Sequence, residues 1–210
     1  TGMSGQRCMA ASVLICVGEV DSILERIVEG ACQMIPGRDL PPLISAEARD
    51  RISTYLDSAV ENGASLLVDG RKASNPSAES GFYTGPSIID YRRGGEMPEA
   101  EVFGPTLEVL RAANLTEAVR LQNSSPFGNA ASVFTQNGRT AEEAVKAFSA
   151  GMCGVNIGIP VPREPFSFGG WNMSRFGAGD ITGESSVDFW AQLKKVTVKW
   201  NPEDKTNWMS

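Results

Sequence analysis

The chain has 210 residues, of which 41% are hydrophobic and 21% charged, values that are ordinary for a soluble globular protein. The formal net charge of −6 argues against a nucleic-acid-binding surface, and no apolar run reaches the roughly 18 residues that a membrane-spanning helix needs. The sequence contains no histidine, which excludes hydrolases of the Ser-His and Cys-His types within this chain.

The cysteines indicate a reducing compartment rather than a disulfide framework. Their number is low for a disulfide-stabilised chain of this length. No two of them form a Cys-x-x-Cys pair and no histidine could complete a zinc site, so we expect no metal. An isolated cysteine is usually an inert, buried residue, and we interpret Cys16, Cys32 and Cys153 in that way.

The first half of the chain is predicted to alternate between apolar strands and amphipathic helices. We expect Asp21 and Ser45 to cap the two helices at their N-termini. In chain order the elements are a strand over residues 10–17, helices over 22–34 and 46–61, a strand over 65–68 and a polar surface loop over 69–82. The buried stripes of the two helices are expected to be Ile23, Ile27, Ala31 and Met34, and Ile52, Leu56, Ala59 and Val60.

The second half repeats this rhythm until a long loop interrupts it. Asn114 and the segment Thr140-Ala-Glu-Glu143 resemble capping boxes, and Gly151 is a candidate C-cap. The expected elements are strands over residues 87–89 and 106–110, a helix over 114–124, a strand over 130–134, a helix over 140–149, a strand over 153–157, a loop over 159–183, a helix over 186–193 and a strand over 196–200.

Alternating strands and helices predict an α/β fold, with a mainly parallel twisted sheet flanked by helices. The loop over residues 159–183 contains several aromatic side chains, which favour an ordered and functional loop. In the last predicted strand, Val196, Val198 and Trp200 alternate with polar residues, which indicates a half-buried strand. That strand could complete the chain's own sheet or pair outside it.

The segment Gly5-Gln6-Arg7-Cys8 is the strongest candidate for chemistry. A guanidinium beside a thiol favours the thiolate, which is the nucleophilic form of cysteine. Cys8 precedes an apolar strand and follows a glycine-containing turn, a position from which a side chain can reach a substrate. We therefore interpret Cys8 as a candidate nucleophile.

Four separated segments, in order, resemble the aldehyde dehydrogenase superfamily and together cover nearly the whole chain. They are Gly5-Gln6-Arg7-Cys8; Glu101-Val-Phe103-Gly-Pro105; Asn123-Ser-Ser-Pro-Phe127-Gly128 followed by Ala131-Ser-Val-Phe-Thr135; and Gly154-Val-Asn156 with the later Phe168-Gly-Gly170. Within the superfamily, the segments Met9-Ala10, Pro160-Val-Pro162 and Phe166-Ser-Phe168 are similar to the methylmalonate-semialdehyde dehydrogenase branch.

The resemblance implies a role for each matched residue. Cys8 would attack the aldehyde carbon, hydride would leave for NAD, and the resulting thioester would be passed to coenzyme A with loss of carbon dioxide. The backbone N–H of Cys8 would stabilise the oxyanion. Glu101 would bind the nicotinamide ribose and Phe103 would lie near the nicotinamide. Arg7 would receive the substrate carboxylate, and Phe168 would line the aldehyde pocket.

The resemblance also implies a domain organisation. Residues 1–185 would form the catalytic domain, residues 186–200 a C-terminal helix with an oligomerisation strand, and residues 201–210 a polar tail. The N-terminal NAD-binding domain is expected to be absent from this chain, so the chain by itself is expected to be inactive. The whole protein would be a homo-oligomer, a dimer or tetramer, that acts on a small semialdehyde and binds neither nucleic acid nor membrane.

Two alternatives remain open at this point. A hydrolytic, NAD(P)-dependent aldehyde dehydrogenase would release a free carboxylic acid, and a protein of another class would use the same fold as a non-catalytic oligomerisation or binding module. The expected location is a reducing intracellular compartment, the mitochondrial matrix in a eukaryote or the cytoplasm in a bacterium.

Overall fold

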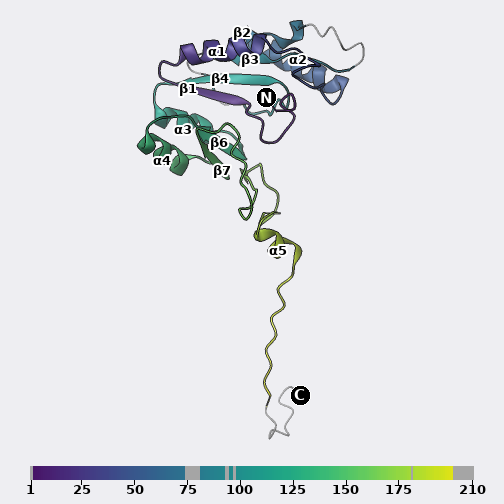
Figure 1. The fold of residues 1–210 in the computed structure, drawn as a ribbon, viewed down its shortest axis with the longest axis vertical. Coiled ribbons are helices and arrows are strands. Elements are labelled where there is room, and N and C mark those ends of the chain that lie inside the picture. The colour runs from purple at the N-terminus through teal and green to yellow at the C-terminus, as the bar shows by residue number, and fades with distance from the viewer. Residues whose placement is uncertain (1, 74–80, 93–94, 97, 181, 201–210) are drawn as a thin grey trace.

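The computed structural model describes residues 2–73, 81–92, 95–96, 98–180 and 182–200 of the chain. Strands and helices alternate along most of it, as predicted (Figure 1). The elements are β1 (Val13–Val17), α1 (Asp21–Cys32), α2 (Ala46–Glu61), β2 (Ser65–Val68), the 3₁₀ turn η1 (Gly70–Lys72), β3 (Ser87–Asp90), β4 (Thr106–Ala112), α3 (Leu115–Asn123), β5 (Phe127–Gly128), β6 (Ala130–Val133), α4 (Gly138–Ala147), β7 (Met152–Val155), β8 (Trp171–Asn172) and α5 (Ser185–Trp190).

The main sheet has the strand order β1-β4-β3-β2. β1 and β3 both run parallel to the central strand β4, with Ile15 opposite Leu110 and Ile88 opposite Leu107, whereas the edge strand β2 is antiparallel to β3. Of the two smaller sheets, the β6–β7 pair is parallel and the β5–β8 pair antiparallel. The prediction of an α/β fold with a mainly parallel sheet is confirmed.

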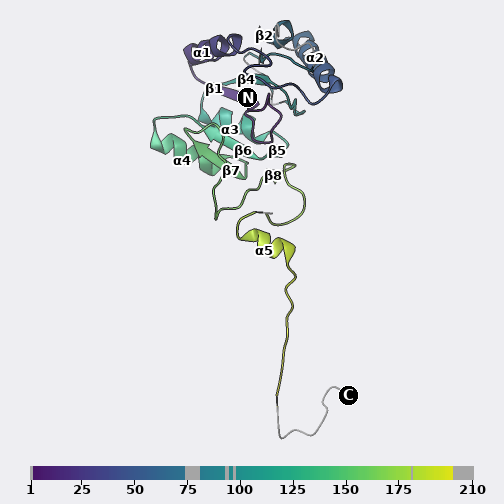
Figure 2. The ribbon, with the colours of Figure 1, turned by 45° about the vertical axis from the view of Figure 1, so that its right-hand side comes forward.

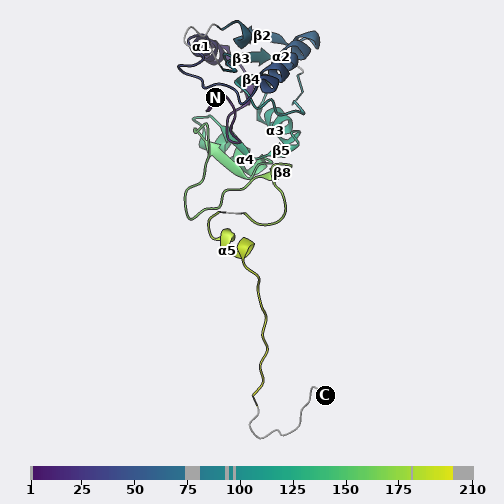
Figure 3. The same cartoon turned by 90° about the vertical axis from the view of Figure 1, so that its right-hand side faces the viewer.

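Helices cover both faces of the main sheet, which explains why β1 is apolar throughout. Leu14 and Cys16 of β1 pack with α1 on one face, and Val13 and Ile15 pack with α3 on the other. Figure 3 shows the sheet between α1 on one side and α2 and α3 on the other. A strand that is buried on both faces has no solvent side on which polar residues would alternate.

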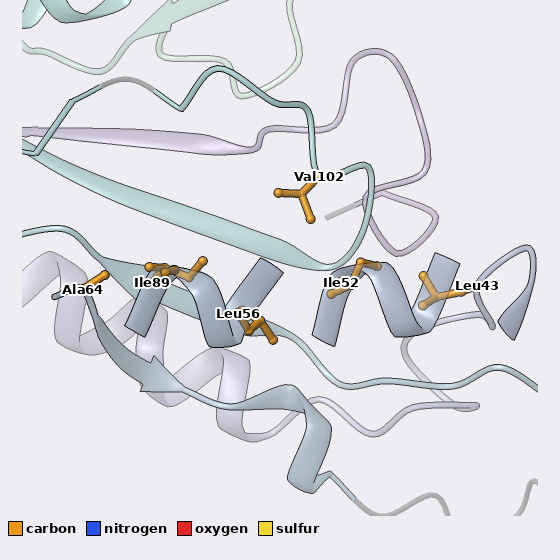
Figure 4. Close-up of a cluster of buried hydrophobic side chains, with 7 residues drawn as sticks. Leu43, Ile52, Leu56, Ala64, Ile89 and Val102 are labelled. Atoms are coloured by element: carbon orange, nitrogen blue, oxygen red, sulfur yellow. The ribbon is translucent and has the colours of Figure 1, made fainter. Parts of the chain in front are cut away.

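The largest buried cluster lies between α2 and the β2–β3 side of the sheet (Figure 4). Leu56 of α2 and Ile89 of β3 are fully buried at its centre. Val102, which belongs to the loop before β4, packs into the same cluster. The hydrophobic core therefore fixes the segment that contains Glu101 and Phe103.

Two predicted helix caps are confirmed and two are wrong. The side chains of Ser45 and Asn114 accept hydrogen bonds from the backbone of the first turns of α2 and α3. Asp21 is instead the first residue of α1, and its carboxylate accepts a hydrogen bond from Arg111 at 2.6 Å rather than from the helix backbone. In α4, Asn137 accepts from the Thr140 N–H, so the helix begins before the predicted cap at Thr140.

Gly151 does not cap α4 either, because that helix ends at Ala147 with Phe148 as its C-cap. A Cβ at Gly151 would overlap the backbone of Gly169 and Gly170. The glycine at this position therefore permits a close approach between two backbone segments.

The predicted buried faces need small corrections. Leu24 is the buried residue of α1, with Ile27, Val28 and Ala31 packed beside it, whereas Ile23 and Met34 are exposed. The buried residues are spaced i, i+3, i+4 and i+7 from Leu24, which places them on one face of the helix, and Met34 lies beyond the end of α1 at Cys32. In α2, Ile52, Leu56 and Ala59 are buried as predicted, but Val60 is exposed.

The C-terminal part extends away from the body of the molecule. Figure 2 shows α5 beyond β7 and β8, and residues 191–200 continue from it as extended chain. The prediction that residues 196–200 form a half-buried strand is wrong for this chain taken alone, since Val196 and Trp200 are exposed and the segment pairs with none of the described strands. Extended chain becomes a strand only where a neighbour supplies hydrogen-bonding partners. The predicted tail, residues 201–210, lies outside the described residues.

Within the described ranges, no helix has the length and apolar character needed to cross a bilayer.

Candidate active site

Cys8 lies at the tip of a tight turn that precedes β1. The Ala10 N–H donates to the Arg7 carbonyl at 3.0 Å, which closes the turn around Cys8 and Met9. The Cys8 side chain is exposed. Its backbone N–H donates to no group in the described part of the chain. The turn therefore presents both a thiol and an available N–H donor, the two groups required to attack a carbonyl and to stabilise the resulting oxyanion.

The residues before Cys8 form an unusual left-handed turn. Met3, Ser4 and Gly5 all have positive φ values, of 58°, 53° and 72°. The Ser4 hydroxyl donates to the Pro41 carbonyl at 2.6 Å, and Ser4 is buried. Positive φ is costly for residues other than glycine, so the ties of this turn to the loop before α2 maintain its shape.

Gln6 joins the same two loops through both ends of its amide. Its Nε2 donates to the Pro42 carbonyl at 3.1 Å, and its Oε1 accepts from the Ile44 N–H at 2.9 Å. These contacts assign a structural role to the glutamine of the segment Gly5-Gln6-Arg7-Cys8. Gln6 fixes the loop and leaves the exposed face of the turn to Arg7 and Cys8.

Gly5 brings the first and second motif segments into contact. A Cβ at Gly5 would overlap the carbonyl of Gly104, so the two backbones touch. Gly104 lies in turn against Ile52 of α2, where a Cβ would overlap the Ile52 side chain. Gly5 therefore requires glycine for the close approach of two backbones, whereas Gly104 leaves room for the end of the Ile52 side chain.

Glu101 and Phe103 are presented at the surface by a segment that the core holds firmly. Between them, Val102 is buried, and its carbonyl accepts a hydrogen bond from Arg51 Nη1 at 2.7 Å. Phe103 has a positive φ of 51° and is 41% exposed, and Glu101 is also exposed. In the part of the chain that the structure describes, the Glu101 carboxylate has no hydrogen-bond or ion-pair partner.

The third and fourth segments approach Cys8 through Asn129. Its side-chain Nδ2 donates to the Cys8 carbonyl at 2.9 Å. A Cβ at Gly170 would lie 3.1 Å from the Asn129 Oδ1, so the double glycine after Phe168 packs directly against this amide. Phe168 itself is half-buried, and its N–H donates to the Thr182 hydroxyl at 2.7 Å. This hydrogen bond joins Phe168 to the C-terminal end of its loop.

Parts of the four segments therefore approach the Cys8 turn in three dimensions. Gly5 contacts Gly104, and Asn129 joins the Cys8 carbonyl to Gly170. The individual roles predicted for Arg7, Phe168, Glu101 and Phe103 remain predictions. Arg7 is exposed beside Cys8 and forms no ion pair with a described residue.

Asn129 and the left-handed turn were not predicted. Asn129 precedes an ordinary strand, and only its position one residue after the Phe127-Gly128 motif could have drawn attention to it.

Of the remaining cysteines, Cys16 is buried and Cys153 is partly buried, whereas Cys32 is exposed, so the prediction of a buried residue is wrong at Cys32. Burial raises the pKa of the Cys16 thiol, against the opposing effect of Arg111, and burial also raises the pKa of Cys153. A raised pKa keeps a thiol protonated and unreactive. All four cysteines are free.

Comparison with known proteins defines the class to which this arrangement belongs. The model of the aldehyde dehydrogenase family matches residues 1–196, which include all four motif segments. The chain belongs to the aldehyde dehydrogenase family.

Two curated relatives from one branch of the family match nearly the whole chain. The chain is 40% identical over 212 residues to the human methylmalonate-semialdehyde/malonate-semialdehyde dehydrogenase [acylating], mitochondrial, and 39% identical over 210 residues to the malonate-semialdehyde dehydrogenase of Pseudomonas aeruginosa. These alignments cover 98% and 95% of this chain, but 40% and 42% of the relatives. The chain thus spans about two fifths of the length of the curated relatives it matches.

Solved structures show the same relationship. The methylmalonate-semialdehyde dehydrogenase of Oceanimonas doudoroffii superposes with a TM-score of 0.88 at 35% identity, over 95% of this chain and 43% of that one. A crystal structure from Sinorhizobium meliloti 1021, described as the same enzyme and complexed with NAD, gives the same TM-score, identity and coverage.

Proposed function

We propose that the protein to which this chain belongs oxidises a carboxylated semialdehyde, of the malonate or methylmalonate semialdehyde type, with NAD as the oxidant. The observation that carries this proposal is the exposed Cys8 thiol on a turn with an available backbone N–H, in contact with Gly104 of the second segment and with Asn129. In the first step the Cys8 sulfur forms a bond to the aldehyde carbon. The new oxyanion accepts a hydrogen bond from the Cys8 N–H.

Glu101 and Phe103 fit the cofactor half of the proposal. A carboxylate without a described partner is free to accept hydrogen bonds from ribose hydroxyls, and an exposed ring on a rigid segment can lie beside a flat nicotinamide. NAD supplies the acceptor for the hydride that leaves the carbon attached to Cys8, which converts the thiohemiacetal into a thioester.

The bond between the carboxylate carbon and the α-carbon of this thioester then breaks to release CO₂, and the α-carbon takes up a proton. The thiol of coenzyme A gives up its proton and takes the acyl group from the Cys8 sulfur, which regenerates the Cys8 thiolate. Overall, a semialdehyde anion, NAD⁺ and coenzyme A give an acyl-CoA that is one carbon shorter, CO₂ and NADH. Arg7 is the proposed partner of the substrate carboxylate, since a guanidinium binds a carboxylate through two hydrogen bonds. Phe168 is the proposed apolar wall of the aldehyde pocket.

We propose the domain boundaries and assembly on the same basis. Residues 1–185 form the catalytic unit, and residues 186–200 pair with another copy in a homo-oligomer, a dimer or tetramer. The exposed apolar side chains of Val196 and Trp200 on extended chain support this role. The free cysteines support a reducing compartment, the mitochondrial matrix in a eukaryote or the cytoplasm in a bacterium.

Product analysis of the full-length protein tests the reaction. With malonate semialdehyde, NAD and coenzyme A we expect acetyl-CoA and NADH, and the Cys8→Ser variant should form neither. Formation of free acid at the same rate without coenzyme A would replace the acylating reaction with the hydrolytic one. If the full-length protein forms no NADH from any aldehyde, whether or not it binds NAD, the result would favour a non-catalytic module.

The role of Arg7 is tested by comparing two aldehydes. The variant Arg7→Leu should raise KM for malonate semialdehyde by at least tenfold, because it removes a charge-assisted pair, and should leave KM for propanal unchanged. An equal rise for both aldehydes would assign Arg7 to the structure of the turn rather than to the carboxylate.

The 210-residue chain on its own should reduce little or no NAD. It contains no glycine-rich, phosphate-binding turn that follows a strand and opens a helix. NADH formation by this chain at a rate near that of the whole enzyme would contradict the proposed division of the cofactor site.

A further inference from the structure

We propose that Asn129 is a positioning residue for the nucleophile: it holds the carbonyl of Cys8 and thereby fixes the direction from which the thiol attacks. The inference rests on the proposed role of Cys8. Asn129 does not touch the reacting atoms in this role and acts only through the backbone of the turn.

The chemistry of the contact is unambiguous. Asn129 Nδ2 lies 2.9 Å from the Cys8 carbonyl oxygen and 3.3 Å from the Met9 sulfur. A carbonyl oxygen and a thioether can only accept hydrogen bonds, so the NH₂ end of the amide must face them. The Oδ1 end correspondingly faces Gly170.

Asn129 is itself rigidly placed. Its own carbonyl accepts from the Met152 N–H at 3.1 Å, and the carbonyl of Gly128 accepts from the Gly151 N–H at 2.9 Å. The side chain starts from backbone that β7 holds in register with β6. Gly170 closes the opposite side, since even one added methyl group there would press on the Asn129 Cα.

The nucleophile turn depends on this single side chain. Ser4 and Gln6 hold the residues before the turn, and the carbonyl of Ser12 accepts from the Glu108 N–H at 2.9 Å after it. Between Gln6 and Ser12, the hydrogen bonds from Asn129 are the only ones that link this segment to the rest of the described chain. Removal of the donor would leave the Cys8 carbonyl without a protein partner and the turn free to shift.

Two substitutions separate the hydrogen bond from packing. Asn129→Asp keeps the size and shape that fill the space beside Gly170 but replaces the donor with an acceptor, whereas Asn129→Leu removes both polar ends. In the full-length enzyme we expect each to slow the burst of NADH by at least about tenfold, with KM for NAD unchanged. Asn123→Leu is the matched control, because its amide also ties two segments together, through Ala147 and Ser149, but forms no hydrogen bond with the Cys8 turn.

The decisive comparison is between Asn129→Asp and the wild type. A burst rate in Asn129→Asp equal to that of the wild type would overturn the proposal, because packing alone would then suffice. A loss of the same size in Asn123→Leu would also overturn it, since the effect would then be a general one on stability. Thermal unfolding of each variant identifies those that are folded at the assay temperature. If Asn129→Asp is unfolded at that temperature, the burst rate of Asn129→Leu is compared with the wild type instead.

The rate at which iodoacetamide alkylates Cys8 tests the positioning role of Asn129 without relying on the proposed reaction. If the wild-type enzyme forms no NADH, the proposed function fails, but the ratio of Cys8 alkylation rates between wild type and Asn129→Asp still tests the positioning role. We expect the two alkylation rates to differ by a factor of about three or more. Equal rates in a folded variant would refute the positioning role of Asn129.

Discussion

Replacement of Gly5 by alanine would separate the two segments on which the proposed site depends. An added Cβ would lie 2.5 Å from the carbonyl carbon of Gly104 and closer still to its oxygen. Non-bonded carbon atoms prefer about 3.5 Å, so the two backbones would have to part by about 1 Å. Alanine at the positive φ of Gly5 adds about 1 kcal/mol of strain. We expect Gly5→Ala to lower the free energy of unfolding by about 2–4 kcal/mol, the sum of strain and overpacking.

The same displacement should affect catalysis more than stability. A shift of about 1 Å between a nucleophile and its partners can lower the rate by about 100-fold, so kcat/KM of the full-length enzyme should fall by about that factor.

Gly18 offers a matched control, because its φ is also positive, at 70°, but an added Cβ meets nothing within 4 Å. Gly18→Ala should lose only the strain of about 1 kcal/mol and should keep its activity. Urea denaturation and NADH formation measure the two effects. Equal losses of stability in the two variants, with full activity in Gly5→Ala, would refute the reasoning.

Three further predictions concern buried and exposed carboxylates. Burial raises the pKa of Glu108, which is 2% exposed, against the lowering effect of hydrogen bonds from Tyr55 and Tyr91. The protonated form is therefore favoured in the folded state, so its contribution to stability is present below the unfolded pKa of about 4.3 and is lost as the pH rises through the folded pKa. The stability of wild type relative to Glu108→Gln should fall as the pH rises from 4 to 8 in urea titrations; parallel curves would contradict the raised pKa. Tyr55→Phe should destabilise by about 1–2 kcal/mol through loss of one hydrogen bond to that carboxyl, with Thr54→Ala as the exposed control. Glu101→Gln should raise KM for NAD by about tenfold without a change in melting temperature, and an unchanged KM would remove Glu101 from the cofactor site.

The sequence predicts the fold well where local signals and burial agree. Ser45 caps α2 as predicted, because its hydroxyl lies within reach of the first-turn backbone and accepts from the Ala48 N–H. The cap at Thr140 is wrong because Asn137, three residues earlier, satisfies the Thr140 N–H itself. The Asp21 carboxylate accepts from Arg111 instead of capping α1, and Arg111 lies 90 positions away, where no local pattern reveals it. These errors arise from competition between short-range and long-range partners.

The candidate site divides in the same way. Cys8, Glu101 and Phe168 could be proposed from their motifs, because each motif is a local string of residues. The contacts that join the motifs could not, since Gly5 against Gly104 and Asn129 against Cys8 depend on how the sheet and its loops fold together. The predicted strand over residues 196–200 is a case in which the local pattern is present but the partner is not. Apolar and polar residues alternate along it, but the described chain supplies no strand beside it.

The anchors of the Cys8 turn have a consequence for folding. The hydrogen bonds of Ser4 and Gln6 span 36 to 38 positions of the chain, and that of Asn129 spans 121. Contacts between residues so distant in sequence require the closure of long loops, so they form after the local helices and hairpins. The turn that carries Cys8, the proposed nucleophile, therefore takes its native shape only once the sheet and both neighbouring loops are complete. In a partly folded chain Cys8 lacks these anchors, so we expect any reactivity that depends on the shape of the turn to appear only with the last contacts of the native state.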